Sequence, residues 1–438
     1  MKTQHTAASW QRWELLILLF LAYFLNQADR ALFGIVLPSL KAELALSDTQ
    51  VGLCSSTLFL VLALMVPMAG FFGDRFSKKW IITVCLIFWS VATMFTGLAT
   101  GVVGLIVFRS IATGGGESFY MPAATTLIAA NHHKTRALAL SIHQSSLYIG
   151  MMISGFLGGW ISGLFGWRSS FYCFGALGIL LGIVLIFRLR DPRDARTDAS
   201  DSRALSPLQA LRQIVRIPTL LLLTVGCTAI VFVNNAFLTW APLFIGRKFH
   251  LSETAAGGFC MLYHHLAALA GVLLGGFLSD KFVRRRPSFR LQLQSAAMLL
   301  GVPLIFMIGR ANSLNSLWTV LFVFGWLRGL YESNTHAAIF DVVPAHIRAT
   351  VVGLVIMTGF LLGSLSPLLL GFLGDRYGTV PGLESGFSLL SVSWLVGGLC
   401  LLAALLFTFK KDRIQEHQND PEVRRNTINQ NSTANAQP

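Results

Sequence analysis

The chain has 438 residues, of which 54% are hydrophobic and only 12% are charged, whereas a soluble globular protein carries about 25% charged residues. So little polar surface could not keep a fold of this size in solution, which excludes a soluble enzyme or binding domain. The net charge of +14 does not indicate nucleic-acid binding, because the basic residues form short clusters between apolar stretches. The main solvent of this protein is the lipid bilayer.

Twelve apolar stretches are each long enough to cross a bilayer, which takes roughly 20 helical residues. They predict an all-α membrane protein with twelve transmembrane helices. The predicted spans are 15–38, 50–72, 80–99, 102–130, 136–162, 168–188, 218–245, 254–280, 288–309, 315–343, 349–373 and 385–409.

The longest break between spans is rich in Arg, Asp and Ser and divides the twelve helices into six and six. We therefore expect two six-helix bundles joined by a cytoplasmic loop and followed by a polar cytoplasmic tail. The corresponding residues are 1–188 and 218–409 for the bundles, 189–217 for the central loop and 410–438 for the tail.

The distribution of Lys and Arg predicts the orientation. If both termini are cytoplasmic, 25 of the 34 basic residues lie on the inside and three lie within spans. Only six lie on the outside, namely Lys41, Arg168, Arg247, Lys248, Arg310 and Arg376. Cytoplasmic segments are enriched in Lys and Arg, so we expect both ends inside.

Short motifs recur in the two halves of the chain. The sequence LSDTQVG from Leu46 opens the second span, and LSETAAG from Leu251 opens the eighth, 205 residues later. GFFGDRFSKK from Gly70 closes the second span, and GFLSDKFVRR from Gly276 closes the eighth, 206 residues later. Nearly constant offsets indicate an internal duplication, which is typical of secondary transporters that rock two bundles about a central site.

The loop sequence GFFGDRFSKK at 70–79 resembles the G-x-x-x-D-R-x-x-R/K-R/K motif of the major facilitator superfamily. QADR at 27–30, LSDTQVGL at 46–53, and GGGE at 114–117 followed by PAA at 122–124 resemble its anion:cation symporter branch, and spinster-like transporters share these features. The resemblance covers about residues 13–409. It implies proton-coupled carriage of organic anions, often sugar acids, or of lipid-derived substrates in the spinster-like case.

The same resemblance gives the loop motif a gating role. Asp74 and Arg75 lie at a helix end, where charge pairing and the helix dipole can hold two bundles in one state. Asp280 is at the matching position in the second half. A simple positively charged turn on the cytoplasmic side is the alternative.

Few ionisable residues fall inside the predicted spans, and each costs about 2.5–3.5 kcal/mol at mid-bilayer, so each is expected to face a cavity or a partner. Asp29 and Arg30 point roughly 100° apart on a helix and need partners from other helices or the substrate. The resemblance implies proton coupling for Asp29 and binding of the substrate's anionic group for Arg30; an interhelical salt bridge is the alternative. Glu117 lies in apolar surroundings that disfavour its ionised form, so it can exchange a proton.

The family pattern also contains an arginine seven residues before the glutamate, which assists it. Arg109 lies eight residues before Glu117, which turns it by roughly 100° in a regular α-helix. A bulge in the glycine run at 114–116 could absorb the extra residue. Arg109 is a candidate substrate-binding residue on this basis.

Further polar residues in the spans are candidates to line a substrate cavity: Gln144, Asn234, Asn235 and Tyr331. Membrane asparagines are as often contacts between helices as ligands. In the second half, Arg328 matches Arg109 and is expected to pair within its helix with Glu332, four residues later. His264 and His265 could face the cavity.

Together with these residues, the resemblance implies a proton-driven symporter for a small organic anion such as a sugar acid, acting as a monomer in a cell membrane, with a bacterial inner membrane favoured. Alternatives are a spinster-like exporter of a lysolipid or other amphiphile, and a non-transporting membrane sensor. Motifs of metalloproteases, serine hydrolases and P-loop ATPases are missing from the sequence. No enzymatic activity, cofactor, metal or nucleic-acid partner is therefore expected.

Overall fold

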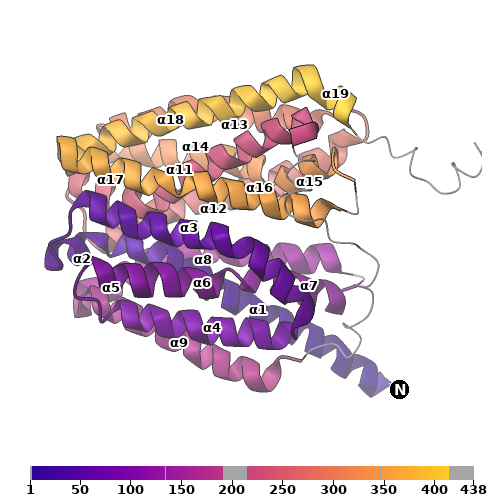
Figure 1. Cartoon of the computed structure of the whole chain (residues 1–438), viewed down its shortest axis with the longest axis horizontal. Helices are drawn as coiled ribbons and strands as arrows, with labels where there is room; N and C mark the ends of the chain where they lie inside the picture. Colours follow the sequence, from indigo (N-terminus) through magenta and orange to yellow (C-terminus); the bar gives the residue numbers. More distant parts are fainter. Residues whose placement is uncertain (1, 134, 191–214, 345–346, 414–438) are drawn as a thin grey trace, which may run out of the picture.

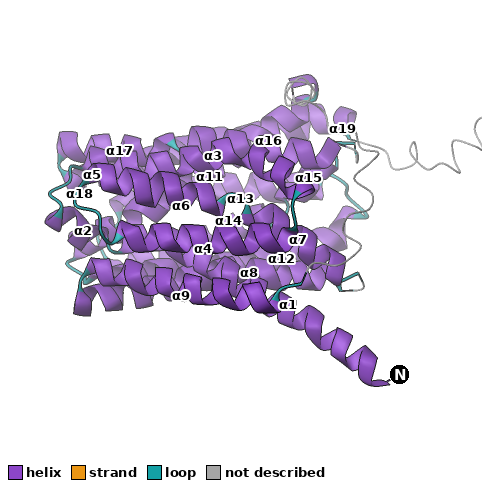
Figure 2. Ribbon diagram, turned by 60° about the horizontal axis from the view of Figure 1, so that its bottom comes forward, coloured by secondary structure: helices purple, strands orange, loops and turns teal. Residues whose placement is uncertain are grey.

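The structure is a computed structural model that describes residues 2–133, 135–190, 215–344 and 347–413. Within these ranges the chain forms helices joined by short turns, with no strand (Figures 1 and 2). The long helices run side by side along one direction, as expected where every backbone group must be hydrogen-bonded inside the segment.

The elements of the first half are α1 (Lys2–Ile35), α2 (Leu37–Glu43), α3 (Asp48–Arg75), α4 (Lys78–Thr96), α5 (Val102–Gly104), the π-helix η1 (Leu105–Ala112), α6 (Thr113–Glu117), α7 (Tyr120–Asn131), α8 (Arg136–Phe165) and α9 (Trp167–Arg188). The elements of the second half are α11 (Pro218–Phe249), α12 (Glu253–Val283), α13 (Phe289–Arg310), α14 (Leu314–Glu332), α15 (Thr335–Phe340), α16 (Arg348–Gly363), α17 (Leu365–Tyr377), α18 (Thr379–Ala403), the π-helix η3 (Ala404–Thr408) and α19 (Phe409–Asp412).

The repeated motif of the sequence starts a helix in both halves. Ser47 accepts a hydrogen bond from the backbone N–H of Gln50, whose side chain accepts one from Ser47 N–H, which makes a capping box at the start of α3. Ser252 accepts from Ala255 N–H at the start of α12. Such caps satisfy backbone donors that a helix N-terminus leaves unpaired.

In the described part of the chain, ten helices are long and apolar enough to cross a membrane. The predicted spans 102–130 and 315–343 do not fulfil that criterion. The first is divided into α5, η1, α6 and α7, and the second into α14 and α15. Glycines at 114–116 weaken the first helix, and the charged pair Arg328 and Glu332 lowers the hydropathy of the second.

Helices pack mainly on partners from their own half of the sequence. In the first half, α1 packs on α8, and α4 packs on α9 and α6. In the second, α12 packs on α14, and α18 packs on α11 and α13. The second half occupies the upper part of Figure 1, in colours from rose through orange to yellow.

Contacts between the halves run mainly through α8 with α12, α3 with α16 and α17, and α1 with α11. We call the end of the molecule that carries Lys2 and Arg413 the terminal end. The opposite end, which carries α2 and the start of α3, is the distal end (Figure 1).

Candidate functional site

Asp29 on α1 pairs with Arg109 on η1. The Nη1 atom of Arg109 lies 3.3 Å from Oδ2 of Asp29, and Nη2 donates to the backbone oxygens of Asp29 and Arg30 at 3.1 and 3.4 Å. Asp29 and Arg109 are only 3% and 2% exposed. Arg109 therefore binds both a carboxylate and the backbone of α1, which ties the fourth predicted span to the first.

Arg30, the next residue on α1, pairs with a different helix. Its Nε atom donates to Oε2 of Glu117 on α6 at 2.6 Å. The Arg30 side chain is 17% exposed, whereas that of Glu117 is fully buried. This geometry uses one edge of the guanidinium group for Glu117, and a guanidinium has two further nitrogens with which to bind an anion.

The π-helix accounts for the unusual spacing between Arg109 and Glu117. One π-turn inserts an extra residue into a helix without changing the direction of the residues on either side. Eight residues that include such a turn therefore place Arg109 and Glu117 on the same face, as seven residues do in an α-helix. The expected bulge exists, but it is η1, which contains Arg109 itself, and it precedes the glycine run.

This register can be tested by changing the length of the helix. Deleting Ala112 should convert η1 to α-helix and keep transport within about threefold of the unmodified protein, since Arg109 and Glu117 stay on one face. Inserting one alanine after Ala112 should abolish transport, because it turns Glu117 away by about 100°. Uptake into proteoliposomes measures both. Equal loss of activity in the two variants would contradict this role of η1.

The two carboxyl groups of the site lie next to each other. Asp29 and Glu117 are within hydrogen-bonding range of one another. Oδ1 of Asp29 and Oε1 of Glu117 are both buried, and the Thr93 side chain lies within hydrogen-bonding range of Asp29. One proton bound between the two groups would satisfy both oxygens, because a protonated carboxyl donates where an ionised one only accepts.

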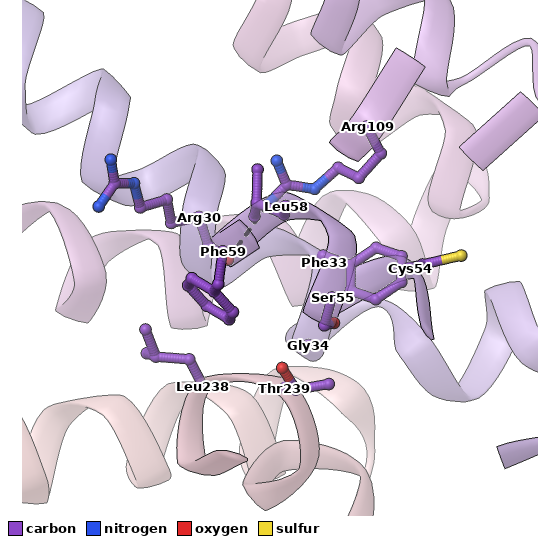
Figure 3. Close-up of a pocket in the computed structure, with 10 residues that line it drawn as sticks. All are labelled: Arg30, Phe33, Gly34, Cys54, Ser55, Leu58, Phe59, Arg109, Leu238 and Thr239. Carbon is purple, nitrogen blue, oxygen red and sulfur yellow. Dashed lines mark hydrogen bonds between the residues drawn. The ribbon is translucent and has the colours of Figure 1, made fainter. Parts of the chain in front are cut away.

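A small pocket lies where α1, α3 and η1 meet α11 (Figure 3). Arg30 and Arg109 lie on one side of it, and Leu238 and Thr239 of α11 lie opposite. Its free volume of about 10 Å³ is room for one water molecule. The charged residues of the first half thus lie at the boundary with the second half.

The other predicted site residues lie on three helices. Gln144 on α8 lies close to the Tyr23 hydroxyl on α1, and Tyr23 is in electrostatic range of Arg30 and Glu117. Asn235 on α11 is fully buried, and neither atom of its amide group has a partner among the described residues. Asn234 is half-buried on the same helix, and Tyr331 is buried on α14.

A second charged cluster forms in the other half. Nη1 of Arg328 lies 2.9 Å from Nε2 of His264 on α12, and Nη2 lies 3.7 Å from Oε2 of Glu332. The hydroxyl of Tyr148 on α8 donates to the same Glu332 oxygen at 3.2 Å. The expected pair within α14 is therefore present, but Glu332 also bonds across the boundary between the halves.

The predicted gating residues lie near the C-terminal ends of their helices, on the side of the terminal end of the molecule. Arg75 is the last residue of α3 and is exposed, and Asp280 is exposed near the end of α12. Asp74 lies on α3, but its side chain is outside the described part of the structure. The gating role of these three residues stays a prediction.

Polar contacts that the sequence did not reveal join the halves at the distal end. Glu253 on α12 accepts from Ser39 N–H at 2.8 Å and from the Ser162 hydroxyl of α8 at 2.5 Å. Asp375 on α17 accepts from the N–H groups of Asp48 and Thr49 at 2.8 Å each.

Asp48 itself binds Lys41 and the hydroxyl of Thr379 on α18. Asp48 and Glu253 are the acidic residues of the repeated motifs LSDTQVG and LSETAAG. An acidic residue repeated at the start of two corresponding helices was the sequence signal that could have marked these two positions. Only the packing shows that each one contacts the opposite half.

Comparison with known proteins identifies a family and several related membrane transport proteins. Residues 19–367 and 266–434 match the Major Facilitator Superfamily. Protein spinster homolog 1 of Xenopus laevis is 25% identical over 430 residues, covering 91% of this chain and 81% of the relative. The cis,cis-muconate transport protein of Acinetobacter baylyi is 26% identical over 414 residues, covering 92% and 94%.

The fold has a solved counterpart as well. A bacterial homolog of the human lysosomal transporter spinster, in an inward-facing and unoccupied conformation, superimposes with a TM-score of 0.82 at 24% identity. The match covers 93% of this chain and 99% of that one. Together with the paired charged helices and the duplicated motifs, these matches show that the chain is a membrane transporter that belongs to the Major Facilitator Superfamily.

Proposed function

We propose that this transporter is a proton-coupled symporter of a small organic anion such as a sugar acid. The observation that carries the proposal is the buried set of two arginines and two carboxylates, in which Arg109 holds Asp29 and Arg30 holds Glu117. A relative that transports cis,cis-muconate, an organic anion by its name, supports the substrate class.

The chemistry of coupling follows from charge balance. With all four groups ionised the set is neutral, so an incoming carboxylate would leave a net negative charge in a low-dielectric site. Protonation of Glu117 or Asp29 removes that charge, and a proton on Glu117 also frees Arg30 for a bidentate contact with the substrate. Anion and proton therefore bind together more readily than either binds alone.

We further propose that twelve spans form two bundles, residues 1–188 and 218–409, with both termini in the cytoplasm. The broken helices around η1 and between α14 and α15 then serve as the fourth and tenth spans. Irregular helices inside a membrane are tolerated where they line a cavity. The terminal end is the cytoplasmic side, and the hydrogen-bonded distal end is the closed outer side of this conformation.

Arg30→Ala should weaken binding of an anionic substrate by about 10- to 100-fold, the effect of losing a charge-assisted contact worth about 1.5–3 kcal/mol. Isothermal titration of the purified protein with sugar acids and other carboxylates measures this change. Arg310→Ala is the matched control, because Arg310 is an exposed arginine at the end of α13. Unchanged affinity in Arg30→Ala would argue for a different substrate class.

One observation favours a second candidate, an exporter of an amphiphile such as a lysolipid. An apolar groove with a volume of about 620 Å³ lies at the boundary between α8 and α12. It is lined by Met152, Ile153, Phe156, Leu157, Trp160, Thr254 and Leu262. An acyl chain fits a groove of this composition, and the resemblance to spinster-like transporters implies lipid-derived substrates.

Thermal stabilisation of the purified protein separates the two candidates, since a ligand that binds the folded state raises its apparent stability. Stabilisation by small carboxylates that is lost in Arg30→Ala supports the symporter. Stabilisation by lysolipids alone supports the exporter. If lysolipids stabilise a Trp160→Ser variant as much as the unmodified protein, the groove is excluded as their binding site.

A further inference from the structure

The cluster around Arg328 has features of a binding site as well as of a structural ion pair. The distance of 3.7 Å from Arg328 to Glu332 is long for a charge-assisted hydrogen bond. Glu332 lies closer to Tyr148, at 3.2 Å, and its side chain is 30% exposed. Glu332 is therefore a loosely held partner that another anion can replace.

His264 orients the arginine toward this position. Arg328 can only donate, so Nε2 of His264 accepts and the imidazole is neutral with its proton on Nδ1. His264 is 1% exposed, and the backbone of Leu321 lies within hydrogen-bonding range of its ring. Arg328 is 6% exposed, and its Nε atom has no partner among the described residues. One buried donor is thus left for an acceptor that the described residues do not supply.

The two charged clusters share a neighbourhood. The ring of Tyr23 on α1 is in electrostatic range of groups from both, namely Arg30, Glu117 and Glu332. Tyr148 is in turn in electrostatic range of Arg328 and of Tyr23. Groups of both clusters therefore lie near Tyr23 of α1 and Tyr148 of α8.

We propose that Arg328 is a second anion-binding residue, so that the transporter takes a dicarboxylate, with one carboxylate on Arg30 and the other on Arg328. This inference rests on the proposed symport of an organic anion and narrows its substrate class. Without substrate, Arg30 binds Glu117 and Arg328 binds Glu332. A substrate carboxylate replaces the internal one at each arginine.

Binding of both substrate groups exchanges charge evenly. Each substrate carboxylate then takes the position of an internal carboxylate beside its arginine, Glu117 beside Arg30 and Glu332 beside Arg328. Tyr23 on α1, Cys227 on α11, Tyr331 on α14 and His336 on α15 are also in electrostatic range of Glu332. Arg328 is the arginine that the structure places at ion-pair distance from Glu332.

The test compares substrates that differ by one carboxylate. The unmodified protein should bind glucarate and adipate at least about tenfold more tightly than gluconate and hexanoate, a difference of about 1.4 kcal/mol. Arg328→Gln should remove this preference and leave monocarboxylate binding within about twofold. Arg30→Gln should weaken both classes. Isothermal titration in detergent at a fixed pH measures all three.

Two further variants keep the result interpretable. Glu332→Gln removes the internal competitor, so it should tighten dicarboxylate binding, which the loss of a purely structural ion pair would not do. Arg310→Gln should change neither class. Equal binding of mono- and dicarboxylates, or equal loss of both in Arg328→Gln, would overturn this inference alone. Failure of every carboxylate to bind would overturn the proposed function with it.

Discussion

Glu117→Gln should abolish proton-driven accumulation of substrate while exchange of substrate across the membrane continues. Glutamine keeps the size of the side chain and an oxygen for Arg30 but cannot release a proton. With the membrane potential clamped at zero, one proton per substrate and one pH unit store about 1.4 kcal/mol, which supports about tenfold accumulation. We expect the accumulation ratio of the variant to fall to about 1.

Asn in place of Asp29 should give the same result, because the two carboxyl groups are neighbours and are expected to share the coupling proton. Proteoliposomes with an imposed pH gradient measure accumulation, and counterflow without a gradient measures exchange. Glu14→Gln is the matched control, since Glu14 pairs with the exposed Arg188 away from the site. Full accumulation in both site variants would remove the coupling role from these residues.

Gly155→Leu should slow transport by about 10- to 100-fold by holding the distal end open. A Cβ atom on Gly155 of α8 would lie 2.7 Å from the backbone oxygen of Gly257 on α12. Backbone cannot move aside as a flexible side chain can, and overpacking typically costs about 1–3 kcal/mol. The penalty falls on the conformation in which α8 and α12 meet, so the alternating cycle loses one of its two states.

The trapped state can be seen by labelling. Ser162 is 5% exposed and donates to Glu253 in the closed distal end. A cysteine at this position, in a background without the six native cysteines, should react with a membrane-impermeant maleimide faster in Gly155→Leu. Gly163→Leu is the control on the same helix, because a Cβ there meets nothing within 4 Å. Slow labelling in Gly155→Leu would contradict a trapped open state.

Much of the architecture could be predicted from the sequence. Hydropathy found the long helices, and the repeated motifs LSDTQVG and LSETAAG mark the starts of α3 and α12, because a Ser before a helix caps its backbone whatever lies around it. The internal structure of the span at 102–130 could not be predicted, because glycines and a π-turn leave its length and mean hydropathy similar to those of a continuous helix. Short elements in that region became visible only in the structure.

The sequence by itself determined that this chain lives in a membrane, that its halves are duplicated, and that Asp29, Arg30, Arg109 and Glu117 are costly charges in need of partners. These conclusions follow from composition, spacing and the free energy of a charge in lipid, all of which are local properties. The sequence could not assign the partners, since any arginine could pair with either acid.

The tertiary structure alone decided those pairings and the contacts between the halves. Asp29 and Arg109 are 80 residues apart, and their contact depends on how η1 is rotated against α1. One π-turn changes that rotation by about the angle between neighbouring helix positions, and the local sequence carries no strong signal for it. The link from Tyr148 to Glu332 and the link from Glu253 to Ser39 and Ser162 likewise arise only from packing, because each joins helices from opposite halves.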